Sequence, residues 1–161
     1  MSTDQSQPTD DLDLTSIHAI VDALYEAISF PPGGRPDWER DRLLFFKSAQ
    51  LIPARREALP ALTPMSVEEF IAWADRYLEE NGFHSTGFHE KDVCRVTEIY
   101  GHIAHVFSTY ESRFTPDNPI PFNRGLNSIQ LVWDEGRWWV TSIIWDMESD
   151  DNPIPARYLH P

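Results

Sequence analysis

The sequence LNSIQLVWDEGRWWVTSIIWDME, residues 126–148, carries the clearest indication of the fold expected for this chain. β-Branched and aromatic side chains fill two extended segments on either side of the turn sequence DEGR. Two such segments joined by a short turn that contains glycine predict a β-hairpin. With Glu135 and Gly136 at the tip, Trp133 pairs with Trp138 across the two strands.

A second hairpin is predicted just before the first, in HEKDVCRVTEIYGHIAHVFSTYESRF, residues 89–114. With Tyr100 and Gly101 at its turn, Ile99 pairs with His102. The proline-rich loop TPDNPIPFNRG then connects the two hairpins. The second half of the chain is therefore expected to form four long antiparallel strands.

Helices are predicted ahead of these strands. The sequence SVEEFIAWADRYLEENG, residues 66–82, has helical apolar spacing and a capping box of Ser66 and Glu69. Apolar residues recur at helical intervals over 17–28, a short helix is expected from Pro36, and AQLIPAR reads as a short strand. We expect an acidic disordered tail at 1–14, a domain at 15–148 and an extended C-terminal tail at 149–161. Three N-terminal helices on a curved antiparallel sheet make an α+β fold, a cone-shaped α+β barrel whose open end is a natural pocket.

Composition limits the classes of function. The net charge of −13 repels phosphate backbones and anionic lipid headgroups, so we expect neither nucleic-acid nor membrane binding. The single Cys94 excludes an intramolecular disulfide and a cysteine-built zinc site. The N-terminal sequence lacks the basic and apolar regions of a signal peptide, so a cytoplasmic location is expected. Six Trp and nine Phe residues must be buried or must line a pocket.

The order of the elements resembles that of the NTF2-like superfamily, which is also called the SnoaL-like or cystatin-like α+β barrel group. The matching segments are IVDALYEAIS (20–29), WERDRLLFFKSAQLIP (38–53), YGHIAHVFSTYESR (100–113) and RGLNSIQLVWDEGRWWVTSIIWD (124–146). The resemblance covers residues 15–148 and implies a cone with a pocket and a homodimer formed through the sheet. It does not fix a function, because the same fold carries ketosteroid isomerases, polyketide cyclases, scytalone dehydratase and uncharacterised proteins.

The catalytic residues of those enzymes are not all present. Isomerase-like members place a carboxylate at the end of the first strand, where this chain reads LIPAR at 51–55. The isomerase mechanism is therefore not supported. Dehydratase-like and cyclase-like members use a His–Asp pair across the cone, and no motif here fixes such a pair.

Strand alternation predicts a candidate site. His105, Glu111 and Arg113 fall on one face of their strand, and we group them with Asn127 on the inner face of the cone. The predicted ligand-binding residues are Tyr25, Trp38, His105, Glu111, Arg113 and Asn127. Among these, His105 and Glu111 are the candidate catalytic residues, with His105 as proton carrier and Glu111 as its orienting group or as a base. The planar guanidinium of Arg113 would bind an anionic or carbonyl oxygen.

Two alternatives remain open for this site. Glu111 and Arg113 also suit a structural ion pair at the end of the sheet. If the inner and outer faces are reversed, Tyr110, Gln130 and Trp145 line the pocket instead. A metal site is not predicted, because His102 and His105 point to opposite faces of a strand, and no phosphate-binding glycine loop is present.

We therefore expect a protein that binds a small hydrophobic or carbonyl-bearing or anionic ligand without a cofactor. It is either an acid/base enzyme on a hydrophobic substrate or a non-catalytic ligand-binding and dimerisation module. A third alternative is a partner protein resembling the small subunit of a ring-hydroxylating dioxygenase. The sequence does not decide whether it is an enzyme.

Overall fold

The structure is a computed structural model that describes residues 11–161 of the chain. The helices are α1 (Ile17–Ile28), α2 (Trp38–Arg42), α3 (Val67–Glu80), α4 (Phe83–Thr86) and a final 3-10 turn, η1 (Ala156–Tyr158). The strands are β1 (Phe45–Pro53), β2 (His89–Tyr100), β3 (Ile103–Arg113), β4 (Asn123–Asp134) and β5 (Arg137–Met147). The α+β class expected from the sequence is confirmed.

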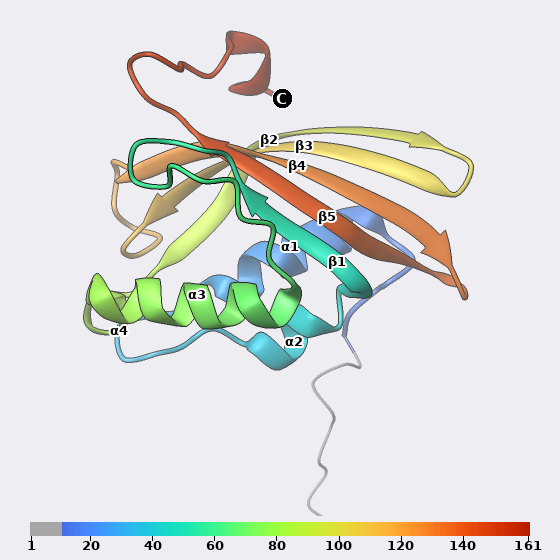
Figure 1. Ribbon diagram of the computed structural model, residues 1–161, viewed down its shortest axis with the longest axis horizontal. Helices are drawn as coiled ribbons and strands as arrows, with labels where there is room; N and C mark the ends of the chain where they lie inside the picture. Colours follow the sequence, from blue (N-terminus) through green and yellow to red (C-terminus); the bar gives the residue numbers. More distant parts are fainter. Residues whose placement is uncertain (1–10) are drawn as a thin grey trace, which may run out of the picture.

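The five strands form one mixed sheet in the order β1-β5-β4-β3-β2. Strands β2 to β5 are antiparallel to their neighbours as predicted, whereas β1 pairs with β5 in parallel. The parallel pair arises because α3 carries the chain away from β1 before the hairpins begin. The expectation of an antiparallel sheet thus holds for four strands, and the sheet curves without closing into a barrel (Figure 1).

Side-chain caps define the beginnings of the two long helices. Ser16 accepts a hydrogen bond from the Ala19 amide at 3.2 Å and begins α1. The predicted capping box is present at α3, where Ser66 and Glu69 exchange bonds of 3.2 and 2.7 Å. Such caps satisfy backbone amides that the helix leaves unpaired and contribute about 1 kcal/mol each.

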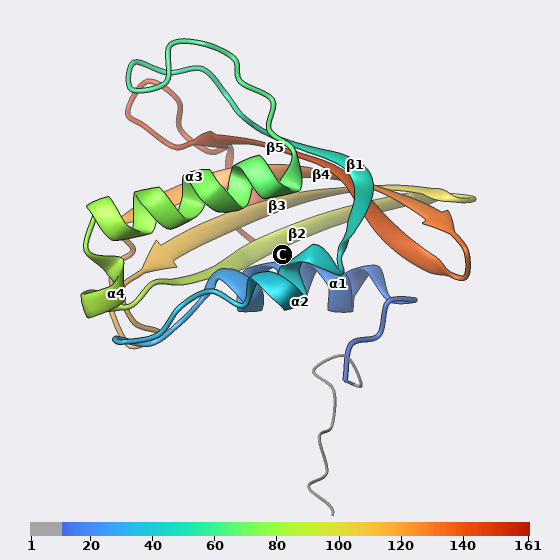
Figure 2. The same cartoon turned by 60° about the horizontal axis from the view of Figure 1, so that its bottom comes forward.

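Helices α1 to α4 lie on one face of the sheet, and the C-terminal segment with η1 crosses the other face (Figure 1). Helix α3 runs along the β1 side of the concave face, while α1 and α2 run along the β2 side (Figure 2). The main core fills the space between α1 and the central strands, and its fully buried members include Ile20, Val21, Val106, Ile129 and Val140. This arrangement leaves the space between α1 and α3 for a pocket.

Each of the two hairpin turns contains a glycine with a positive φ. Glu135 and Gly136 form the tip of the β4–β5 hairpin with φ of 49° and 79°, so Trp133 pairs with Trp138 as predicted. In the β2–β3 hairpin Tyr100 pairs with Ile103, so the turn lies one residue later than expected. The shift places Gly101, at φ 54°, in the first turn position, which requires a positive φ.

Two irregularities in register change which side chains face the helices. The β2–β3 pairing shifts between Asp92 and Cys94, and the β4–β5 pairing shifts beside Thr141. Each shift inserts one unpaired residue, so the alternation of side chains changes face at that point. Neither β-bulge was expected from the sequence.

The segments at both ends of the described chain contact the domain. Residues 1–10 of the expected acidic tail lie outside the described residues, whereas Leu12 and Leu14 pack against the core. At the other end Thr109 donates a 2.6 Å hydrogen bond to the Tyr158 carbonyl, and Phe107 packs edge-on against the Tyr158 ring. No helix within residues 11–161 is long and apolar enough to cross a membrane.

Candidate functional site

A cavity of about 510 Å³ lies between the concave face of the sheet and helices α1, α2 and α3. Nine of the 24 residues that line it have aromatic side chains. They are Tyr25, Trp38, Phe45, Phe70, Trp73, Tyr77, Phe88, Tyr110 and Trp145. This volume falls within the usual range for small-molecule sites, which are mostly apolar with a few placed polar groups.

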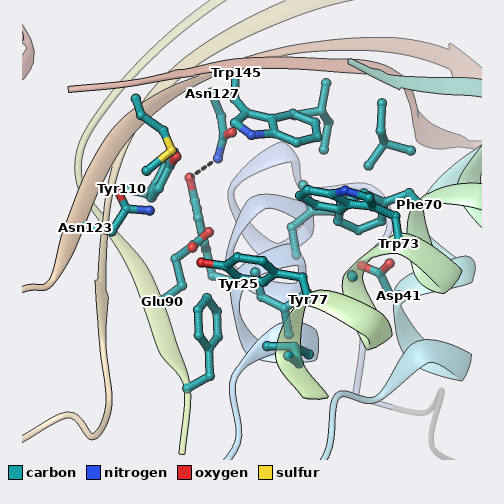
Figure 3. Close-up of a pocket in the computed structure, with 18 of the residues that line it drawn as sticks. Tyr25, Asp41, Phe70, Trp73, Tyr77, Glu90, Tyr110, Asn123, Asn127 and Trp145 are labelled. Atoms are coloured by element: carbon teal, nitrogen blue, oxygen red, sulfur yellow. Dashed lines mark hydrogen bonds between the residues drawn. The ribbon is translucent and has the colours of Figure 1, made fainter. Parts of the chain in front are cut away.

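The apolar wall of the cavity is built by α3 and β5 (Figure 3). Phe70 packs edge-on against Trp145, with ring centroids 6.0 Å apart and planes at 81°. Trp73 lies 6.3 Å from the same ring and stacks on Tyr77 at 5.8 Å. One turn separates Phe70 from Trp73, and the next separates Trp73 from Tyr77, so helical periodicity aligns the three rings along the cavity.

A chain of hydrogen bonds runs from the cavity into the protein. Asn127 donates to the Tyr25 hydroxyl at 3.0 Å, and that hydroxyl lies 2.6 Å from Ser108 Oγ. Ser108 in turn donates to a carboxylate oxygen of Asp92 at 2.9 Å. Because Ser108 has one proton and directs it to Asp92, the Tyr25 hydroxyl must donate to Ser108. Tyr25 therefore presents a lone pair, not a proton, toward the cavity.

Asp92 is itself fixed by Arg95, whose guanidinium donates to it at 2.6 and 2.9 Å. Arg95 also bonds Asp22 of α1 at 2.7 Å. In this bidentate pair both carboxylate oxygens of Asp92 act as acceptors. The ion pair thus holds α1 against β2 and fixes the hydroxyl of Tyr25.

Asp41 is the buried acid at the α2 end of the cavity. Its side chain is 2% exposed, and its Oδ2 atom has no hydrogen-bond partner within the described chain. Burial raises the pKa of Asp41 to about 7, and the nearby charge of Arg42 offsets only part of that effect. An unpaired buried carboxyl is costly, so it points to a role beyond stability.

Glu90 is the second titratable group of the cavity and lies across from Asp41 (Figure 3). One of its carboxyl oxygens accepts a 2.8 Å hydrogen bond from Ser112. Burial raises the pKa of Glu90 to about 7, although the bond from Ser112 lowers it. Near neutral pH the cavity therefore holds two carboxyl groups that each exist in both protonation states.

Tyr110 reaches the cavity because its neighbour on β4 is a glycine. The ring passes over Gly125, where any Cβ atom would overlap the Tyr110 hydroxyl and lie 2.6 Å from the Asp146 carbonyl oxygen. Burial raises the pKa of Tyr110, and the charge of Glu90 adds to the effect. Tyr110 is thus a neutral phenol under ordinary conditions.

The structure brings together three of the six side chains predicted to bind a ligand. Tyr25 from α1, Trp38 from α2 and Asn127 from β4 all line the cavity. Trp38 is held by a 2.8 Å bond from its indole nitrogen to Asp75 of α3. These three positions show that the expected covering helices lie over the expected face of β4.

The expected grouping of His105, Glu111 and Arg113 with Asn127 is wrong. In the β3–β4 register Asn127 pairs with Ser108, which puts it on the same face as the even-numbered residues of β3. His105, Glu111 and Arg113 lie on the opposite face. They are excluded from the cavity because neighbouring side chains on a strand alternate between faces.

On that outer face His105 lies 3.2 Å from Ser128 Oγ, through its Nε2 atom. Arg113 donates to Glu111 at 2.7 Å, and Arg124 lies 3.6 Å from the same carboxylate. The alternative of a structural ion pair at the end of the sheet describes Glu111 and Arg113 correctly.

The reversed-face alternative is correct in two of its three residues. Tyr110 and Trp145 line the cavity, whereas Gln130 is exposed on the outer face, paired with His105. Trp145 joins Asn127 on the inner face because the bulge beside Thr141 shifts the alternation of β5.

Sequence reasoning missed Asp41 and Glu90. A signal for Asp41 was present, because it follows Trp38 by three residues and so shares its helix face. No comparable signal marks Glu90, since the bulge in β2 separates its alternation from that of the later strand residues. Within residues 11–161, no group of three His, Cys, Asp or Glu side chains is placed to hold a metal ion.

Comparison with solved structures identifies the fold. An NTF-2-like protein of unknown function from Silicibacter pomeroyi is 19% identical, with 81% of this chain and 92% of that chain covered at a TM-score of 0.55. A protein of unknown function from Mycobacterium tuberculosis is 12% identical, with coverage of 88% and 80% and a TM-score of 0.61. A protein with a cystatin-like fold from Nostoc punctiforme is 11% identical, with coverage of 71% and 78% and a TM-score of 0.55.

Comparisons by sequence find no such similarity. No protein-family model matches the chain. No curated protein matches it either. At these identities the structural neighbours establish the fold alone, and the resemblance noted in the sequence is confirmed at that level.

Proposed function

We propose that this protein of NTF2-like fold binds a small, largely apolar molecule in the cavity between α1, α3 and the sheet, and acts on it by proton transfer without a cofactor. The observation that carries the proposal is the cavity itself, in which an aromatic wall faces two buried carboxyl groups with pKa values near 7. A structural core of this size would be filled and would exclude unpaired carboxyl oxygens.

The aromatic wall suits a flat or ring-containing apolar body. Phe70, Trp73 and Trp145 present edges and faces in tilted and edge-on pairs, which leaves ring surface available to a ligand. Aromatic contacts of this kind favour offset or edge-on ring partners. The apolar part of the ligand would therefore lie beside Trp73 and Trp145.

Asp41 is the candidate for proton transfer. A general acid or base is most effective when its pKa lies near the working pH, and burial places the pKa of Asp41 at about 7. Its Oδ2 atom is buried without a partner within the described chain, so its capacity to form a hydrogen bond is unused. Tyr25 and Asn127, fixed by hydrogen bonds, would orient the ligand from the opposite wall.

Binding can be tested with N-phenyl-1-naphthylamine, a neutral apolar dye whose fluorescence rises in an apolar site. Ala74 is buried and lines the cavity, so Ala74→Phe should fill part of the volume and abolish dye binding. Ala72 is exposed on the same helix, and Ala72→Phe is the matched control that should bind as the wild type does. Equal dye binding by Ala74→Phe and the wild type, with both folded, would refute the cavity as the binding site.

A homodimer formed through the outer face of the sheet is the second proposal. Apolar side chains remain exposed there, with Val96 at 40%, Ile103 at 59% and Ile144 at 44%. The register of β2 to β5 puts all three on the face away from the helices. Exposed apolar side chains that gather on one face of a sheet suit a protein–protein contact.

A further inference from the structure

Arg56 lies in the loop between β1 and α3 and lines the cavity. Its backbone is held by two hydrogen bonds with Leu59, at 3.0 and 2.8 Å, which close a tight turn at the cavity wall. One guanidinium nitrogen, Nη1, is buried without a partner among the described residues, and no ion pair in residues 11–161 involves Arg56. A buried guanidinium nitrogen without an acceptor is costly, and the carboxylate of a bound ligand would supply the missing acceptor.

Two phenol groups lie close enough to Arg56 to be affected by its charge. The positive charge of Arg56 acts to lower the pKa of both Tyr77 and Tyr110, although burial keeps both pKa values raised. Neither hydroxyl has a hydrogen-bond partner among the residues that the structure describes. Each can therefore donate to a ligand oxygen.

Glu90 completes this end of the cavity. Its charge acts on the same two tyrosines, in the direction opposite to that of Arg56, and the close-up shows its carboxyl near the Tyr77 hydroxyl (Figure 3). With a pKa of about 7, Glu90 can hold a proton and become an O–H donor. The groups that face Glu90 are Tyr25, Tyr77, Tyr110 and Ser112, while His89 and Lys91 lie on the other face of β2.

We propose that the ligand of this cavity is an amphipathic monocarboxylic acid, whose carboxylate lies among Arg56, Tyr77, Tyr110 and a protonated Glu90. This inference rests on the proposed binding function and names its ligand class. The apolar body extends from this end along Trp73 and Trp145 toward Asp41. A carboxylate suits the site because the guanidinium fork bonds both of its oxygens in one plane.

Binding of the carboxylate is linked to a proton. An ionised Glu90 repels the ligand, so the bound state keeps Glu90 protonated to higher pH than the free state does. Above pH 7, where Glu90 of the free protein ionises, binding of one ligand is therefore coupled to the uptake of up to one proton by Glu90. The dissociation constant should rise by up to tenfold per pH unit between pH 7 and pH 9.

The test uses two probes of nearly identical shape, 1-naphthaleneacetate and its neutral amide, which compete with N-phenyl-1-naphthylamine. At pH 6.5 the wild type should prefer the acid by at least about tenfold, the usual scale of a buried charge-assisted bond. Arg56→Met should abolish this preference and still bind the amide and the dye. Arg55 is exposed and adjacent, so Arg55→Met removes the same charge as a matched control and should keep the preference.

Glu90→Gln provides the second arm, because it keeps a donor and cannot ionise. Its affinity for the acid should be independent of pH from 7 to 9, in contrast to that of the wild type. An unchanged preference in Arg56→Met, or no preference in a wild type that binds the dye, would overturn the carboxylate assignment and leave the binding function intact. A wild type that binds neither dye nor acid nor amide would overturn the binding function itself.

Discussion

Replacing Asp41 with Asn tests whether the buried carboxyl of the cavity reduces the stability of the protein. In the folded state burial raises the pKa of Asp41 from 3.8 to about 7. A shift of about 3 pH units corresponds to about 4 kcal/mol of unfolding free energy, taken as an upper limit. Asn has nearly the same shape and cannot ionise, so it isolates this electrostatic contribution.

The sign of the effect follows from proton binding. The folded state holds the proton of Asp41 more tightly than the unfolded state does. The resulting contribution to the unfolding free energy is fully present below pH 4 and is lost as the pH rises from 4 to 7. Above pH 7 the loss is complete and constant. The wild type and Asp41→Asn should therefore be about equally stable at pH 4, and the variant should be more stable by up to about 4 kcal/mol at pH 8.

Urea unfolding followed by tryptophan fluorescence at several pH values between 4 and 8 measures this difference. Glu39 is exposed on the same short helix, so Glu39→Gln serves as a matched control and should follow the wild-type profile. Parallel profiles for Asp41→Asn and the wild type would refute the reasoning, because they would mean that Asp41 has an ordinary pKa in the folded protein. A stabilising variant at pH 8 would identify a group that the fold retains at a cost, as functional sites do.

Two further predictions concern the packing of the sheet and its outer face. Gly125→Ala forces a Cβ atom against the Tyr110 hydroxyl and a backbone carbonyl. It should therefore lower the unfolding free energy, measured by urea unfolding, by about 1–3 kcal/mol. A loss below about 0.5 kcal/mol would contradict the close approach of Tyr110 to Gly125. Ile103→Lys places a charge on the exposed outer face of β3. Analytical sedimentation should therefore show a dimeric wild type and a monomeric variant. Equal masses for the two proteins would exclude this face as the dimer interface.

Local patterns determined much of this fold. The capping box of Ser66 and Glu69 begins α3 as predicted, and the glycine at 136 sets the turn that pairs Trp133 with Trp138. These features depend on residues only a few positions apart, so the local sequence is enough to predict them. The same local signals, taken in order, predict the α+β class.

The composition of the pocket depended on tertiary structure. One unpaired residue in each of β2 and β5 shifts the alternation of side chains, and a strand read without its bulge assigns the residues beyond it to the wrong face. For β3, alternation correctly separated the odd-numbered residues from the even-numbered ones. Which of the two groups faces the cavity is decided only by the helices that pack against Val106 and Tyr110. His105 was therefore expected in the pocket and lies outside it.

The elements, their order and the two hairpins follow from contacts between near neighbours in the chain, so they could be predicted from the sequence. Only the tertiary structure placed Asp41, Arg56 and Glu90 around one cavity, from a helix, a loop and a strand. Their unusual properties are consequences of burial, which raises the pKa of the two acids and leaves an Arg56 nitrogen without an acceptor. Burial depends on how distant segments pack, and no local pattern of residues specifies it.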